Sequence, residues 1–330
     1  MKRFVFLVAL IGFVVFSVPA GGGRDGQRRT SLTVGGGMVG STVYLLAAGM
    51  SELVNRESES VRLTAQTTQG FTENVRLVGR NEVQFGFTST GGTFEGLTGT
   101  GSFQGEPAYS ELRCIAVAYD GAIMVIVQDD ITSIEQLAGR AFNLGPAGSN
   151  ISLYGNAIFR AYGIHDSMRL SNLDLNDGVD RFVEGSIAGF MGGPPPYPAV
   201  LTAAAQRRLR ILSIPEQRFT AINEFAKCFP GVVPRTAYDF MTEDIIGTGY
   251  ATYILAHSSV SDDVVYEILS IMMTPEGLAY LESGTTAWDM ENSGPALADG
   301  EALRVVGLKM HPGATRFWES RGYRIPNDIR

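Results

Sequence analysis

The sequence predicts an α/β protein built as two lobes, and three observations support this expectation. The chain has 330 residues, which is long for one small module and suits two units of roughly 120–170 residues. Short apolar runs typical of strands alternate with segments of helical periodicity, a pattern that favours parallel sheets covered by helices. Two glycine-rich turns each lie between an expected strand and an expected helix.

The chain begins with the pattern of a secretory signal peptide. Lys2 and Arg3 precede an apolar run from Phe4 to Val18, and small residues follow it up to Ala20. We therefore expect a signal peptide over residues 1–20, a glycine-rich flexible leader over 21–30, and a periplasmic protein. An uncleaved N-terminal anchor is the alternative, although the apolar run is short for a membrane span.

Strands and helices alternate through the first part of the folded chain. We expect strands at Leu32–Val34, Val61–Thr68 and Val83–Phe87, and helices at Ser41–Val54 and Phe71–Val78, the first capped by Ser41 or Thr42. The apolar segment Leu112–Val127 reads as two strand-like runs broken at Asp120-Gly121.

The same alternation continues toward the C-terminus. Strands are expected at Ala141–Leu144, Leu173–Leu175, Ile187–Met191, Leu209–Ile214 and Thr252–Ala256, and helices at Ser149–Tyr162, Asp177–Glu184, Pro198–Arg208 and Ser261–Met273. We assign residues 31–120 and 240–330 to lobe 1 and residues 121–239 to lobe 2. The chain then crosses between the lobes twice.

The composition excludes several classes of protein. Hydrophobic residues make up 45% of the chain and charged residues 18%, so a buried core is expected and disorder is not. The net charge is −8 and no run of Lys or Arg exceeds two residues, which argues against nucleic-acid binding. Two cysteines and three histidines lie far apart in sequence, so we expect no metal and no cofactor. Cys114 lies in an apolar run typical of a buried strand, and its pairing with Cys228 stays open.

The first glycine-rich turn matches the dinucleotide pattern G-x-G-x-x-G through Gly35, Gly37 and Gly40. A dinucleotide site also needs an acidic residue at the end of the second strand, to bind the ribose. That strand ends in Thr67-Thr68-Gln69-Gly70, which contains no carboxylate. The pattern therefore does not favour a nicotinamide enzyme.

A glycine-rich turn at a helix N-terminus can instead bind an anion through backbone N–H groups and the helix dipole. The second turn, Asn143–Asn150, repeats this arrangement in the other lobe. Two such turns facing each other across a cleft would hold a small acid without a charged side chain. The alternative is that both are ordinary strand-to-helix turns.

Catalytic machinery is not expected. No serine lies in a G-x-S-x-G elbow, and His165, His257 and His311 are far apart in sequence. We expect His165 to be solvated and the other two histidines to be structural. The paired carboxylates at Asp129-Asp130 and Asp262-Asp263 are expected to be solvated as well. Trp288 and Trp318 are expected to pack in the core rather than to stack on a ligand. We therefore expect a protein that is not an enzyme.

Seven segments, taken in their order, resemble one family: GGGMVGST, TTQGFTENVRLV, VQFGFTS, LRCIAVAYDGAIMVIV, AGRAFNLGPAGSNIS, GFMGGPPPYPAV and MHPGATRFWESRGY. The chain resembles, from Leu32 to Tyr323, the TAXI family of extracytoplasmic solute receptors of TRAP transporters. GPAGSN and GGPPPYPAV are the most specific pieces of this resemblance.

The resemblance implies a type II periplasmic-binding-protein fold with two α/β lobes, a central cleft and two hinge crossovers. It implies a monomer that binds a small carboxylate or a glutamate-like amino acid and docks on the subunits of a TRAP membrane permease. The residues that match the family's binding positions are Gly37, Met38, Ser41, Thr42, Tyr44, Gln69, Gly70, Asn74, Thr88, Ser89, Tyr119, Gly148, Ser149, Asn150, Gly192, Gly193 and Pro194.

Two departures from the family pattern bear on the ligand. Met38-Val39 stands where the family commonly has Gly or Thr, which makes one edge of the pocket more apolar and favours a less polar acid. Asn150 stands where Gly is frequent and adds an amide to the site. The expected function is capture of a small acid by lobe closure and its delivery to a permease. A periplasmic sensor or adaptor of the same fold and, less favoured, a secreted enzyme remain alternatives.

Overall fold

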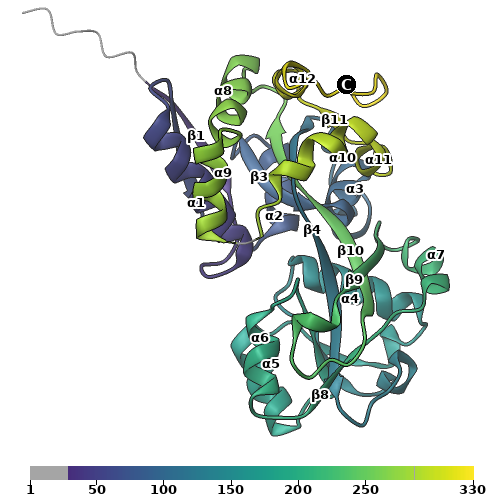
Figure 1. Cartoon of the computed structure of the whole chain (residues 1–330). Helices are drawn as coiled ribbons and strands as arrows, with labels where there is room; N and C mark the ends of the chain where they lie inside the picture. Colours follow the sequence, from purple (N-terminus) through teal and green to yellow (C-terminus); the bar gives the residue numbers. More distant parts are fainter. Residues whose placement is uncertain (1–28, 286) are drawn as a thin grey trace, which may run out of the picture.

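The computed structural model describes residues 29–285 and 287–330 (Figure 1). The expected signal peptide and residues 21–28 of the expected leader lie outside these residues. In the described part, eleven strands form one curled, mixed sheet in the order β2-β1-β3-β10-β4-β7-β5-β6, while β8 and β11 pair with β4 and β9 pairs with β10. None of the described helices is both long and apolar enough to cross a membrane.

Lobe 1, the upper part of Figure 1, contains both the first and the last elements of the chain. Its strands are β1 (Thr30–Gly35), β2 (Val61–Gln66), β3 (Phe85–Ser89) and β11 (Lys309–Met310), and its helices are α1 (Thr42–Glu57), α2 (Phe71–Gly79), α3 (Thr90–Thr98), α8 (Asp262–Met272), α9 (Pro275–Gly284), α10 (Ser293–Asp299), α11 (Glu301–Arg304) and α12 (Pro312–Ser320). Parallel β1 lies between β2 and β3, and β11 pairs with the start of β4.

Lobe 2, the lower part of Figure 1, is made of the middle of the chain. Its strands are β5 (Ala141–Asn143), β6 (Arg169–Ser171), β7 (Gly189–Gly192), β8 (Leu209–Leu212) and β9 (Phe229–Val233), and its helices are α4 (Asn150–Ala161), α5 (Leu175–Glu184), α6 (Pro198–Ala204) and α7 (Phe219–Ile222). Short 3₁₀ turns lie at Gly101–Phe103, Ile134–Leu137, His165–Ser167, Glu216–Arg218, Arg235–Ala237 and Met290–Asn292.

Two long antiparallel strands, β4 (Leu112–Gln128) and β10 (Ile245–His257), run from one lobe into the other. In lobe 1, β10 pairs with β3; in lobe 2, it pairs with β9, while β4 pairs with β7 and β8. Their pairing has irregularities between Thr252 and Tyr253 and between Ile254 and Leu255. These strands are therefore the two crossovers that the sequence predicts.

The expected break at Asp120-Gly121 is wrong, because β4 is one continuous strand of 17 residues. Asp120 pairs with Ala251 and Gly121 with Tyr250, so the ladder runs through both residues. Gly121 is needed here for space rather than for a turn. A Cβ at this position would lie 2.5 Å from Cζ of Tyr250.

Three other expectations are also wrong. Leu173–Leu175 is not a strand: Asp174 caps α5, where its carboxylate accepts a hydrogen bond from the Asp177 N–H at 3.0 Å, and the strand lies earlier at β6. The sheet is not parallel throughout, because β10 runs antiparallel to β3 and β4. The helix expected at Pro198–Arg208 ends already at Ala204.

Several expected structural residues are confirmed. Cys114 is buried as expected, and the pairing that the sequence left open is not formed, since Cys114 and Cys228 are both buried free thiols. Trp288 and Trp318 belong to the main core, which extends along β4 and β10 from lobe 1 into lobe 2. A second buried cluster fills the far side of lobe 2 around Met124, Phe182 and Phe190.

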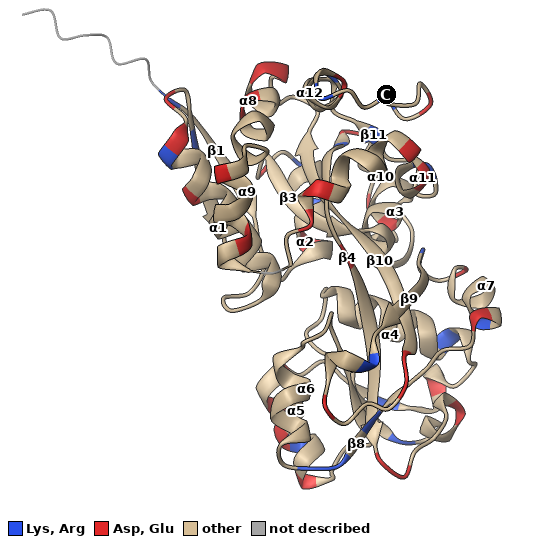
Figure 2. Cartoon of the chain, viewed as in Figure 1, with Lys and Arg blue, Asp and Glu red and all other residues tan. Residues whose placement is uncertain are grey.

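The histidines and acidic pairs lie away from the cleft. His257 ends β10, and His311 is fully buried as the N-cap of α12. His165 is only partly exposed, contrary to the expectation of solvation, because its ring hydrogen-bonds the side chains of Asn156 and Asp166. The two acidic pairs are exposed as expected. Acidic and basic residues are scattered along the outer helices and loops of both lobes (Figure 2).

Candidate functional site

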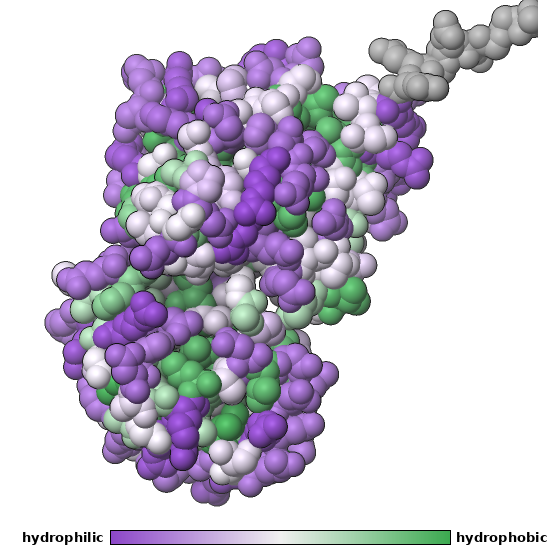
Figure 3. Space-filling model, turned by 180° about the vertical axis from the view of Figure 1, so that it is seen from behind, coloured by the Kyte–Doolittle hydropathy of each residue, from purple (hydrophilic) through white to green (hydrophobic). Residues whose placement is uncertain are grey.

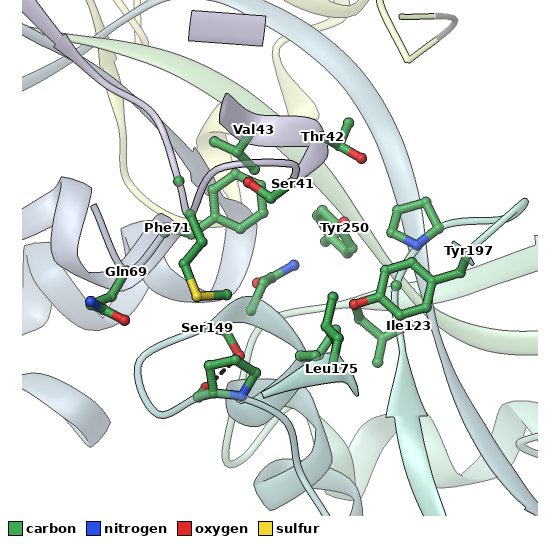
Figure 4. A pocket seen from close by; sticks show the side chains of 18 of the residues that line it. Ser41, Thr42, Val43, Gln69, Phe71, Ile123, Ser149, Leu175, Tyr197 and Tyr250 are labelled. Atoms are coloured by element: carbon green, nitrogen blue, oxygen red, sulfur yellow. Dashed lines mark hydrogen bonds between the residues drawn. The ribbon is translucent and has the colours of Figure 1, made fainter. Parts of the chain in front are cut away.

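A pocket of about 110 Å³ lies between the lobes, where both lobes contribute its walls (Figure 4). Seen from behind, hydrophilic residues cover much of the surface, and hydrophobic residues are exposed on the lower lobe (Figure 3). The lining residues are Gly37, Met38, Ser41, Thr42, Val43, Gln69, Gly70, Phe71, Tyr119, Ile123, Pro146, Ser149, Asn150, Ile151, Leu175, Gly193, Pro194, Tyr197 and Tyr250. This lining contains no Lys, Arg, His, Asp or Glu.

The first glycine-rich turn delivers the N-terminus of α1 to the pocket. Ser41 caps the helix by accepting a hydrogen bond from the Tyr44 N–H at 3.2 Å. The first N–H groups of a helix have no partner within it. In α1 the N–H groups of Thr42 and Val43 are left without a partner, and both residues line the pocket. A side chain at Gly37 would place its Cβ 2.6 Å from Oγ of Ser41, so glycine is needed for this close approach.

The second glycine-rich turn does the same for α4 from lobe 2. Ser149 caps the helix: its Oγ accepts from the Ser152 N–H at 3.3 Å and donates to the Pro146 carbonyl at 2.6 Å. The free N–H groups at the start of this helix belong to Asn150 and Ile151, which also line the pocket. Two helices from different lobes therefore begin at one cavity.

This arrangement makes the pocket favourable for a negative charge. The N-terminus of each helix carries roughly half a positive charge, and its free N–H groups are donors for anion oxygens. Since the lining contains no basic side chain, backbone groups supply the positive potential.

Aromatic side chains form the deep wall of the pocket. Tyr119 on β4 and Tyr250 on β10 contact edge to face with ring centroids 6.4 Å apart, and Phe71 packs on Tyr250 at 6.1 Å. Burial raises the pKa of both tyrosines, so their hydroxyls stay neutral donors and acceptors. Tyr197 and Ile123 extend the apolar wall in lobe 2. The pocket thus combines a site for an anion with apolar surface.

Asn150 presents a buried amide to the pocket. The residue is 7% exposed, and neither Nδ2 nor Oδ1 has a hydrogen-bond partner. The Tyr250 hydroxyl is a polar neighbour of this amide. Burial raises the pKa of Tyr250, and the amide lowers it by a smaller amount. The pair nevertheless lacks the geometry of a hydrogen bond.

Most of the residues that the sequence predicts for the site come together here. Those that line the pocket are Gly37, Met38, Ser41, Thr42, Gln69, Gly70, Tyr119, Ser149, Asn150, Gly193 and Pro194. Their direct role in binding a ligand stays a proposal.

The other predicted residues do not line the pocket. These are Tyr44, Asn74, Thr88, Ser89, Gly148 and Gly192. The Asn74 amide is used internally, since it donates to the carbonyls of Gly36 at 2.7 Å and Phe87 at 2.9 Å. Ser89 caps α3, and Thr88 is fully buried beside it. Asn74 therefore supports the first glycine-rich turn from behind.

Sequence reasoning missed the apolar part of the site, which consists of Val43, Phe71, Ile123, Pro146, Ile151, Leu175, Tyr197 and Tyr250. Val43, Phe71 and Ile151 directly follow residues that were predicted, so extending each turn by one residue would have found them. Tyr250 carries no local signal. It reaches the pocket because β10 pairs it with Gly121 of β4.

Solved structures with similar folds share little sequence with the chain. XAC2383 from Xanthomonas citri bound to ATP is 11% identical with a TM-score of 0.54, and the match covers 89% of this chain and 98% of that one. The chloride-bound form of XAC2383 gives 12% identity, a TM-score of 0.51 and coverages of 88% and 99%. The periplasmic aliphatic sulphonate binding protein SsuA from Escherichia coli is 13% identical with a TM-score of 0.44, over 91% and 89% of the two chains.

These likenesses concern the fold alone. The expected two-lobed α/β fold, with a central cleft and two crossovers, is confirmed. The family is shown by a separate match, because the model described as the NMT1-like family matches residues 34–322, most of the chain. The chain belongs to the NMT1-like family.

Proposed function

We propose that the chain is an extracytoplasmic solute receptor that binds a small organic acid between its lobes and presents it to a membrane permease. The observation that carries this proposal is that α1 of lobe 1 and α4 of lobe 2 both begin at one pocket without a charged side chain. A carboxylate is one of the small anionic groups that helix N-termini bind.

Lobe closure is the proposed mechanism. Lobe 1 (31–120 and 240–330) and lobe 2 (121–239) are joined through β4 and β10, which act as the hinge. A ligand can drive closure only through contacts that it makes in the closed form and lacks in the open form. Two or three charge-assisted hydrogen bonds, each worth roughly 1.5–3 kcal/mol, are enough to shift a nearly balanced hinge.

The walls of the pocket favour an acid with an apolar body. Phe71, Ile123 and Tyr197 offer apolar surface, and Met38 extends it at the edge. A glutamate-like amino acid fits less well, because no carboxylate in the lining can pair with its ammonium group. Catalysis is not proposed, since Ser41 and Ser149 are used as helix caps and no base stands beside either of them in the lining.

The permease and the compartment are further steps of this proposal. Export to the periplasm is supported by the pattern of residues 1–20, and a monomeric receptor for a TRAP-type permease is supported by the GPAGSN and GGPPPYPAV motifs. Sequencing the N-terminus of the exported protein tests cleavage after Ala20. Uptake by vesicles that contain a TRAP permease from the same genome, with and without the purified receptor, tests the partner.

The binding proposal is tested by a thermal-shift screen of the purified full chain against aliphatic and aromatic acids, amino acids and the methyl esters of the same acids. A ligand at 100 times its Kd stabilises the folded state by about 2.7 kcal/mol. We expect one class of acids to raise the unfolding temperature and the neutral esters to have no effect. Equal stabilisation by the esters, or formation of a product during incubation, would contradict the proposal.

A further inference from the structure

The side chain of Asn150 is unusual because it leaves both a donor and an acceptor unpaired inside the protein. Few buried side-chain atoms in the described residues lack a partner: Oγ of Ser51, Oγ1 of Thr252, Nε1 of Trp288, and Nδ2 and Oδ1 of Asn150. Of these residues, only Asn150 lines the pocket. Its unpaired amide therefore belongs to the place where a ligand is expected.

The amide has no structural task that would account for its burial. The N-cap of α4 is Ser149, so Asn150 is not needed to close the helix. A buried polar group without a partner destabilises the fold. An amide placed at an otherwise apolar wall gains its two hydrogen bonds only when something enters the pocket.

The two atoms of the amide demand different groups from the ligand. Nδ2 is a donor, which a carboxylate oxygen can satisfy. Oδ1 is an acceptor, which a carboxylate cannot satisfy, so the ligand must bring an N–H or O–H of its own. A charged ammonium group would lack a counter-charge, because the lining holds no Asp or Glu. An uncharged donor remains.

We infer that Asn150 makes the receptor selective for acids that carry a hydroxyl, an uncharged hydrogen-bond donor, beside the carboxylate. This inference rests on the proposed function and specifies its ligand class. A ligand hydroxyl would donate to Oδ1 of Asn150 and accept a hydrogen bond from the Tyr250 or Tyr119 hydroxyl, which face the same pocket. The carboxylate would meet the free N–H groups of α1 and α4 and the Nδ2 donor.

The experiment compares acids that differ in one substituent. The first set is 3-methylbutanoate, both enantiomers of 2-hydroxy-3-methylbutanoate, and valine; the second is 3-phenylpropanoate, both enantiomers of 3-phenyllactate, and phenylalanine. Within each set the group on the second carbon changes from hydrogen to hydroxyl to ammonium. Affinities for the full chain are measured by calorimetry. We expect one hydroxy acid to bind at least about tenfold more tightly than the matching acid without the hydroxyl, and more tightly than the amino acid.

Variants assign this preference to the amide. In Asn150→Leu the advantage of the hydroxy acid should fall to less than about twofold, because the donor and acceptor are gone. Asn156→Leu is the matched control on the same helix. It loses an amide that already donates to the Ser152 carbonyl at 2.8 Å and lies outside this pocket, so the preference should be kept.

A second readout separates a ligand-directed amide from a structural one. Without ligand, Asn150→Leu should unfold at the same or a higher temperature than the wild type, because it removes unpaired polar atoms, whereas Asn156→Leu should unfold at a lower temperature. Equal binding of the acid with and without the hydroxyl, tighter binding of the amino acid, or a marked loss of thermal stability in Asn150→Leu would overturn the inference and leave the proposed function standing. Binding of no acid in the two sets or in the wider screen would overturn the proposed function and the inference together.

Discussion

The hydroxyl of Tyr154 accepts a hydrogen bond from the N–H of Gly91 at 3.0 Å and so joins α4 of lobe 2 to α3 of lobe 1. The same hydroxyl donates to the Lys227 carbonyl at 3.0 Å, and the ring stacks on Tyr250 of the crossover strand with centroids 5.6 Å apart. Tyr154 is fully buried. One side chain thus connects both lobes, the hinge and the wall of the pocket.

We predict that Tyr154→Phe lowers the free energy of unfolding by about 1–3 kcal/mol, because the Gly91 N–H and the Lys227 carbonyl both lose a buried partner. Urea denaturation measures the change. Tyr162→Phe near the end of the same helix is the control and should cost less than about 0.5 kcal/mol, since Tyr162 is partly exposed. A wild-type midpoint for Tyr154→Phe would show that the hydrogen bonds between the lobes are dispensable.

Ser149→Ala is expected to weaken acid binding as well as helix α4. Loss of the cap should cost about 0.5–2 kcal/mol of stability, and the N–H groups that face the ligand would lose their fixed orientation. Ser261→Ala removes an equivalent cap from α8, where the Ser261 Oγ accepts from Val264, and serves as the control. It should lower stability similarly and leave ligand affinity unchanged. Equal effects of both variants on affinity would contradict the role of α4 in the binding site.

Gly37→Val should lower the affinity for the acid more than Ser149→Ala does. A Cβ at Gly37 would lie 2.6 Å from Oγ of Ser41 and 3.3 Å from Cβ of Val43, so the turn must shift and the N-terminus of α1 moves with it. Calorimetry with the best acid from the screen measures the loss. Gly139→Ala, at an open surface position with positive φ, controls for strain at a glycine away from the pocket. Retained affinity in Gly37→Val would contradict the role assigned to this turn.

His311 should make the fold sensitive to acid. Its Nε2 donates to the Val260 carbonyl at 3.0 Å and its Nδ1 accepts from the Gly313 N–H at 3.2 Å, so the buried ring is neutral. Burial lowers its pKa and the nearby Arg113 acts in the same direction, while the Asp262 carboxylate at 3.7 Å partly opposes them.

Because the folded-state pKa lies below the unfolded value of about 6.5, the unfolded chain takes up the proton more readily. The stability that neutral His311 contributes is complete above pH of about 6.5 and is lost as the pH falls toward the folded-state pKa. Urea midpoints between pH 7.5 and pH 5 measure this loss, and His311→Asn, which keeps an N-cap, should reduce the slope. His165→Gln is the control and should leave the slope of the urea midpoint against pH unchanged. The same unchanged slope in His311→Asn would show that another group causes the acid sensitivity.

The two thiols should be unreactive in the folded protein. Burial raises the pKa of Cys228 to about 12 and raises that of Cys114 as well, so little thiolate forms at neutral pH. A chromogenic disulfide reagent should detect almost no thiol in the native chain and two thiols after unfolding in urea. Absence of thiols after unfolding would instead reveal a disulfide.

Sequence reasoning located the parts of the site that depend on local chemistry. A glycine-rich turn followed by a serine that can cap a helix indicates a helix start from local residues alone, and the turns before Ser41 and Ser149 both lie at the pocket. Sequence reasoning failed where pairing between distant segments decides which residues reach the site. β10 enters the sheet between β3 and β4, a position that nothing within residues 245–257 indicates.

Asp120-Gly121 and Asn74 show the same limit. A glycine after an aspartate usually marks a turn, but here the ladder with β10 runs through both residues, and the Tyr250 ring fills the space above Gly121. Asn74 has a residue type that suits a binding site, yet neighbouring carbonyls already occupy its amide. Whether a polar side chain serves the ligand or the fold depends on such tertiary partners.

The place of β10 in the sheet also governs how the chain can assemble as it is made. β1, β2 and β3 emerge first, but the strand that joins them to β4 ends only at His257. Until then the edge of β3 has no neighbour, and lobe 1 must wait for almost four-fifths of the polypeptide. Lobe 1 can therefore be completed only late in synthesis, while lobe 2 can form earlier.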